Sequence, residues 1–230
     1  NTPLVQLASS EEETSLMKIL VKNRGNLGLE LLKADTTMYA KPSWPGRNHG
    51  GLISHNDGRL DPIKFQQCIL KAMEKYDVKK IATSVICLER ALSTTKSRWY
   101  LHLDNGNSLT QDSVVICAVL GSEALLNPLG HSRPIAPILG QVLDLQLNNT
   151  QKNWSGWPAV LVSESINLIP NGSNRIWVGA TLEQGTNAST TCLEKMLKMN
   201  GVAPNWLKEA SIHAKWHGLR GRPVQRPPLY

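Results

Sequence analysis

Three arginines, Arg220, Arg222 and Arg226, stand close together in the final stretch of the chain, WHGLRGRPVQRPPLY. This stretch has no acidic residue, and its prolines disfavour a helix. A guanidinium group binds a carboxylate or phosphate through two parallel hydrogen bonds. The stretch is therefore either a solvated basic tail or one wall of an anion-binding site whose other walls lie elsewhere in the chain.

His213 and His217 are four residues apart, a spacing that can form a metal-binding pair on a helix. The residues between them alternate between apolar and polar, which is typical of a strand. Because no HExxH acid or third ligand accompanies them, we predict surface histidines and no metal site. The sequence also lacks a G-x-S-x-G nucleophile motif, a P-loop and a G-x-G-x-x-G dinucleotide fingerprint.

The charge of the chain is basic but dispersed. There are 25 Lys and Arg against 18 Asp and Glu, a formal net charge of +7. No run of like charges and no basic stripe interleaved with aromatic residues is present, so we predict no nucleic-acid partner. No apolar stretch reaches the roughly 18 residues that a membrane span requires, so we predict no membrane partner either.

Four cysteines, Cys68, Cys87, Cys117 and Cys192, are far apart in the sequence and form no CxxC pair. This spacing disfavours zinc ribbons and redox sites, and most of these residues lie in apolar runs, which predicts buried reduced thiols. With few cysteines and no signal peptide, the sequence indicates a cytoplasmic protein. The chain starts without Met and ends in a proline-rich segment, so we expect a portion of a longer polypeptide.

The elements that must position these residues are predicted from hydrophobic periodicity and capping residues. Helices are expected over 9–23, where Ser9 or Ser10 can cap, and over 61–76, where Asp61 caps. A third helix is expected over 187–201. Strands are expected over 52–54, 80–89, 97–106, 112–120, 138–147, 159–163, 166–170, 175–183 and 210–221.

The strands expected over 112–120 and 138–147 differ in pattern. The first, DSVVICAVL, is almost continuously apolar, which predicts a strand buried on both faces. The second, ILGQVLDLQL, alternates between apolar and polar residues, which predicts a long strand. With three helices and a majority of strands, the predicted fold class is α+β, a mostly antiparallel sheet flanked by a few helices.

The order of several short motifs resembles the middle part of the flavin-dependent D-amino-acid oxidase and glycine oxidase family, from about Glu11 to Pro223. These motifs are DGRLDPIKFQQCILKA, SVICLE, WYLHLDNG…DSVVICAVLGSEALL, ILGQVLDL, INLIPNGSNRIWVGATLE and WHGLRGRP. The resemblance implies the substrate domain of a two-domain flavoprotein oxidase fold. Within the single fragment 1–230, it implies that 78–90 and 112–126 are strands contributed to the FAD-binding domain.

The resemblance also implies a function, the oxidation of an amine or amino acid by hydride transfer to FAD. Among the arginines, Arg220 matches the family residue that binds the substrate carboxylate, whereas Arg222 and Arg226 match nothing equivalent. The substrate contacts implied are Arg220, Asn167, Gly179 and Thr181. The cofactor contacts implied are Val85, Cys117, Ala118 and Val119.

The chain departs from the family pattern at several points. The N-terminal G-x-G-x-x-G unit is absent, Val119 stands where the family turn usually has glycine, and Asn167 stands near a position that is often aromatic. We therefore expect this chain alone not to hold FAD tightly, and its partner to be the FAD-binding domain of the same polypeptide. The alternative is a flavin-free binding or scaffold domain that kept the fold without catalysis.

Overall fold

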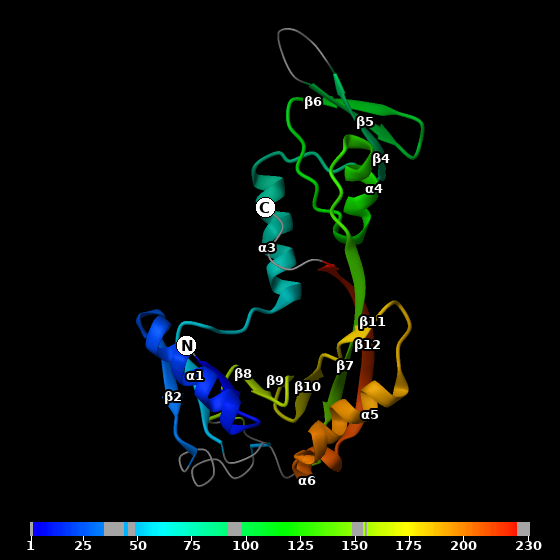
Figure 1. The fold of residues 1–230 in the computed structure, drawn as a ribbon. Helices are drawn as coiled ribbons and strands as arrows, with labels where there is room; N and C mark the ends of the chain where they lie inside the picture. The colour runs from blue at the N-terminus through cyan, green and yellow to red at the C-terminus, as the bar shows by residue number, and fades with distance from the viewer. Residues whose placement is uncertain are drawn as a thin grey trace. The chain divides into compact units, whose positions relative to one another are not determined.

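The structure is a computed structural model that describes residues 2–34, 44–45, 49–91, 98–148, 154 and 156–224. Its elements divide into two compact units (Figure 1). The first unit comprises Asn1–Leu60 and Leu139–Gly218, and the second comprises Asp61–Ile138 and Leu219–Tyr230.

The larger sheet runs in the order β11-β7-β10-β9-β8-β1-β3-β2, and β12 also pairs with β7. Nearly all described pairings are antiparallel, and the exception is β1, which lies parallel to β8. The strands of this sheet are β1 (Leu4–Leu7), β2 (Leu29–Leu32), β3 (Gly51–Ser54), β7 (Ile135–Gln146), β8 (Val160–Ser163), β9 (Ile166–Asn171), β10 (Arg175–Gly179), β11 (Glu183–Gln184) and β12 (Ser211–Pro223).

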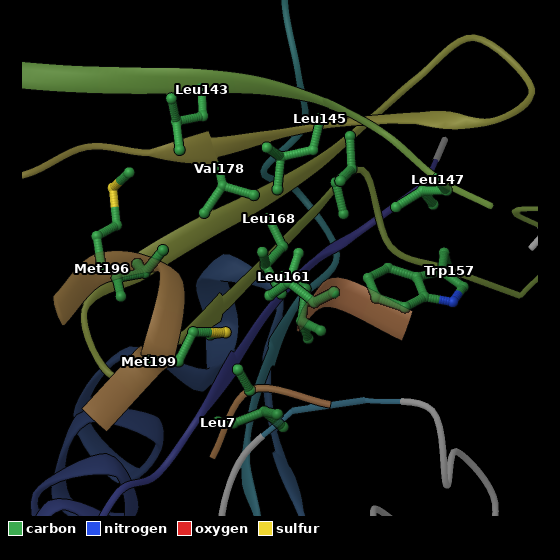
Figure 2. Close-up of a cluster of buried hydrophobic side chains, with 14 of the residues drawn as sticks. Leu7, Leu143, Leu145, Leu147, Trp157, Leu161, Leu168, Val178, Met196 and Met199 are labelled. Atoms are coloured by element: carbon green, nitrogen blue, oxygen red, sulfur yellow. The ribbon is translucent and has the colours of Figure 1, made fainter. Parts of the chain in front are cut away.

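The core of the first unit forms where this sheet meets α5 (Thr190–Lys198) and α6 (Asn205–Lys208) (Figure 2). Alternate side chains of neighbouring strands point to the same side, so their apolar residues make one continuous layer. Met196 and Leu207 from the two helices pack on that layer. The fully buried strand residues of this cluster are Val5, Leu143, Leu145, Leu161, Leu168, Ile176 and Val178.

Helix α1 (Glu11–Arg24) begins where the sequence predicts, because Ser10 caps it. The hydroxyl of Ser10 accepts a hydrogen bond from the amide of Glu13, and the Glu13 carboxylate accepts one from the amide of Ser9. These two bonds satisfy amides that have no partner within the helix. Met17 anchors the helix in a second, smaller apolar cluster with Ala8 and Leu52.

The second unit contains helix α3 (Pro62–Lys75), capped by Asp61 as predicted, and an antiparallel sheet in the order β4-β5-β6. A short helix, α4 (Ser122–Leu126), contacts β4. The strands of this sheet are β4 (Val85–Ala91), β5 (Arg98–Leu103) and β6 (Ser108–Gln111).

Two predictions from the sequence are wrong. Residues 113–118 form no strand, and Val115 is 85% exposed, because an apolar run signals burial without specifying a pairing partner. The cysteines are free, but Cys68 and Cys117 are exposed and the other two are half-buried. Their apolar neighbourhoods in the sequence therefore do not amount to burial in this structure.

Candidate functional site

The second unit contains a hollow of about 480 Å³ beside the segment 114–118. Val85, at the start of β4, lines it together with Cys117 and Ala118. Three of the four predicted cofactor contacts are therefore brought to one place. The remaining wall is mostly apolar and includes Leu88, Leu101, Val114, Ile116 and Leu125.

Val119, the fourth predicted cofactor contact, begins a short 3-10 turn and has a φ of 48°. Its side chain lies against Gly221 of β12. A Cβ atom at Gly221 would stand 2.8 Å from Cγ1 of Val119 and 2.7 Å from Cγ2 of Ile135, so only glycine fits there. Val119 therefore contacts Gly221, the residue that follows Arg220 in β12. Arg220 itself is exposed on this strand.

The other predicted substrate contacts belong to the first unit. Asn167 of β9 and Gly179 of β10 lie directly opposite each other in the sheet. On its other side, Gly179 faces Val142 of β7, and a Cβ atom at Gly179 would stand 2.8 Å from Cγ2 of Val142. The absence of a side chain at Gly179 allows these strands to pair closely.

Thr181 follows Gly179 by two residues and belongs to a buried polar network. Its hydroxyl donates to Oε1 of Glu183 and accepts a hydrogen bond from the amide of Gln141 at 2.8 Å. The side-chain amide of Gln141 donates to Oε1 of Glu183 at 2.9 Å, and the amide of Ser189 donates to Oε2 at 2.6 Å. The side chain of Thr181 is therefore directed into the protein.

The environment of Glu183 keeps its carboxylate ionised. Burial raises its pKa, but the hydrogen bonds from Thr181, Gln141 and the Ser189 amide, with the charge of His217, outweigh burial and bring the pKa below its ordinary value. No sequence motif singles out Glu183. The signal available was an acid two residues after Thr181, on the same side of an extended segment, with exposed Leu182 between them.

The remaining candidates that the structure describes neither line the hollow beside segment 114–118 nor belong to the hydrogen-bond network of Glu183. His213 and His217 are exposed on β12, and no cluster of three or more potential metal ligands occurs among the described residues. Arg222 is exposed on the same strand, and Arg226 lies outside the described residues. No helix in the described part of the chain is long and apolar enough to span a membrane.

Comparison with known families identifies the group of proteins to which this site belongs. Residues 1–229 match the family described as FAD dependent oxidoreductase. The chain belongs to this family. The match covers the predicted substrate and cofactor contacts alike, and it speaks against the flavin-free alternative. FAD is the cofactor of the family, as the resemblance implied.

Individual relatives agree with the family assignment. Over 115 residues the chain is 30% identical to a glycine oxidase of Pseudomonas putida, a match that covers 49% of this chain and 30% of the relative. The structure of glycine oxidase from Geobacillus kaustophilus has a TM-score of 0.79 at 18% identity, over 97% of this chain and 60% of that one. L-proline dehydrogenase from P. horikoshii has a TM-score of 0.75 at 15% identity, over 95% of this chain and 60% of that one.

These structural similarities show a shared fold, that of the flavoprotein oxidases, in agreement with the predicted α+β class. The chain spans about 60% of the length of the solved relatives and 30% of the curated glycine oxidase. The described residues fit part of a flavin nucleotide site, because the hollow beside Val85, Cys117 and Ala118 offers a mostly apolar wall for a planar ring.

Proposed function

We propose that the protein is an FAD-dependent oxidoreductase that oxidises the C–N bond of a small amine or amino acid bearing a carboxylate. The observation that carries this proposal is the family match over residues 1–229. When bound, FAD supplies the redox chemistry by accepting a hydride from the carbon next to the substrate nitrogen. The substrate also gives up a proton from its nitrogen and becomes an imine.

The role proposed for Arg220 is to bind and orient the substrate carboxylate. A planar guanidinium can form two parallel hydrogen bonds with a carboxylate, which fixes both position and direction. The role proposed for Asn167 and Gly179 is to form the part of the substrate site contributed by β9 and β10. Because the Thr181 hydroxyl is committed to Glu183 and Gln141, Thr181 contributes by holding the segment that follows Gly179.

The cofactor contacts proposed are Val85, Cys117, Ala118 and Val119. The first three line one hollow, which supports a common ligand for them. Segments 78–90 and 112–126 then serve the FAD-binding domain, and the rest of fragment 1–230 serves the substrate domain. This chain alone is proposed not to hold FAD tightly, because the glycine-rich fingerprint that binds a pyrophosphate is absent from its sequence.

The partner proposed is an FAD-binding domain of the same polypeptide. Two observations support it: the solved relatives are longer than this chain, and the second unit exposes apolar side chains along α3 and around Val115. No nucleic-acid or membrane partner is proposed. A cytoplasmic location is proposed because the four cysteines are few, widely spaced and unpaired.

Replacement of Arg220 tests the proposed substrate contact in the full-length protein. Arg220→Ala should raise KM for the carboxylate substrate roughly 100-fold, because hydrogen bonds to a charged group contribute about 1.5–3 kcal/mol. The flavin absorbance should stay unchanged. Arg222→Ala, on the same strand, is the matched control and should leave KM within error; an equal effect of both variants would show that a general loss of positive charge is responsible.

A further inference from the structure

Glu183 is a buried carboxylate that receives hydrogen bonds from three separate segments of the first unit. Gln141 lies in β7, Thr181 in the connection after β10, and Ser189 at the N-cap of α5. Only 6% of Glu183 is exposed. The carboxylate therefore ties a central strand, the end of β10 and the start of a helix to one point.

The hydrogen bonds around Glu183 require an acceptor at both of its oxygens. Oε1 accepts from Gln141 and Thr181, and Oε2 accepts from the backbone amide of Ser189. A neutral glutamine at this position would direct an NH₂ group at one of these donors and leave a buried donor without an acceptor, which costs about 1–3 kcal/mol. The site is thus built for a carboxylate rather than for any polar side chain.

Packing alone does not explain why a charged carboxylate, that of Glu183, is buried at this position. Removing a carboxylate from water is costly, and a well-packed apolar residue of similar volume often gives equal or greater stability. What the carboxylate adds is direction, because hydrogen bonds to an ionised group are short and strongly oriented. It fixes the Thr181 hydroxyl, which also accepts from the Gln141 amide at 2.8 Å.

We infer that Glu183 is a positioning residue that holds Thr181, and through it Gly179, in the geometry required at the part of the substrate site that β9 and β10 contribute. Only one part of this inference rests on the proposed function, namely the effect of Glu183 on turnover. The local part, that the carboxylate organises residues 179–189, concerns this chain alone and is measured without turnover.

The experiment compares Glu183→Gln with two control variants in the full-length protein. Asp144→Asn also removes a buried carboxylate from the same unit, where Asp144 accepts from Asn171 at 3.3 Å and pairs with Arg175 at 3.3 Å. Glu194→Gln removes an exposed carboxylate from α5. The first control matches the loss of buried charge, and the second matches the chemical change alone.

Turnover and amide hydrogen exchange are both measured. Glu183→Gln should lower kcat about 10- to 100-fold with a much smaller change in KM, because a misplacement of about 1 Å at a reacting centre can cost 100-fold. Amides of residues 179–189 should exchange faster in this variant, with or without flavin. Neither effect should appear in Asp144→Asn or Glu194→Gln.

A second pair of variants tests whether the effect passes through the Thr181 hydroxyl. Thr181→Val removes the hydroxyl and should reproduce the loss seen in Glu183→Gln, whereas Thr181→Ser keeps it and should lose less. Adding Glu183→Gln to Thr181→Val should produce less than the product of the two separate losses, because both variants break the same contact.

The outcomes separate the inference from the proposed function. If wild-type protein shows no flavin and no turnover, the proposed function fails, and the exchange measurement decides the local part. If Glu183→Gln matches Asp144→Asn in exchange at residues 179–189, or turns over at the wild-type rate, the inference is overturned.

Discussion

Val119 has a backbone conformation that usually requires glycine. Its φ is 48°, and β-branched residues are rare in this region because Cβ crowds the following carbonyl. The family resemblance places a glycine at this turn, so the sequence shows the departure but not its conformational consequence. The turn keeps a glycine-like backbone although a valine occupies it.

Replacement of Val119 should therefore favour glycine over alanine. Both Val119→Gly and Val119→Ala remove the contact with Gly221, but only glycine relieves the positive φ. We expect Val119→Gly to be more stable than Val119→Ala by about 1 kcal/mol, measured as the difference in free energy of unfolding in urea. An alanine variant as stable as the glycine variant would mean that this backbone is not strained.

The residues of the candidate site differ in how far the sequence can predict them. Val85, Cys117 and Ala118 were expected near one ligand from motif order, and they line one hollow. Glu183 was not expected, because a single acid in a strand gives no sign of its partners. Its hydrogen bonds come from residues up to 42 positions away, and only the folded chain brings them together.

At the scale of elements, prediction succeeded where the signal is local. Helices α1 and α3 begin at their predicted caps, Ser10 and Asp61, because capping depends on the next three residues. The short strands β1 and β2 were missed. Each has only four residues, and β1 is stabilised by pairing with β3 and β8, which lie far from it in the sequence.

The pairing of β7 with β10 depends on the absence of a side chain at Gly179. Gly179→Ala would put a Cβ atom 2.8 Å from Cγ2 of Val142, so the Val142 side chain or one of the two strands must shift. We expect a loss of about 1–3 kcal/mol in the free energy of unfolding, as for other overpacked sites.

A second substitution distinguishes this steric cause from a change in backbone freedom. Val142→Ala removes the methyl groups that the new Cβ atom would meet. The double variant should therefore be more stable than the sum of the two single changes predicts. Simple additivity, measured by the same urea denaturation, would contradict the steric explanation.

At the scale of the whole molecule, motif order predicted more than any single pattern did. The family follows from six short motifs in sequence, and the match over residues 1–229 bears it out. The α+β class follows from the helix and strand patterns and agrees with the fold of the solved relatives. The prediction of a strand over 112–120 was wrong, because an apolar pattern indicates burial but does not specify the strand with which the segment would pair. Among the described residues no strand pairs with it, and Val115 remains exposed.

Helix α3 also has an apolar pattern whose side chains are exposed, and this holds over its whole length. Its apolar side chains are exposed although they share one face: Phe65 is 49% exposed and Ile69 is 45% exposed. An amphipathic helix is stabilised mainly by burying such a face, so α3 is expected to be covered in the full-length protein. The occupant proposed is the FAD-binding domain of the same polypeptide.

Ile69→Asp in the full-length protein tests this occupant. A charge at a covered apolar position should lower both the thermal midpoint and the fraction of protein that carries flavin, because an unpaired buried charge is costly. Gln67→Asp introduces the same charge into the same helix about 160° around the axis from both Phe65 and Ile69, and it should change neither quantity. If the two variants have the same thermal midpoint and the same flavin content, this face of α3 is exposed to solvent. The apolar residues of α3 then do not bind the FAD-binding domain.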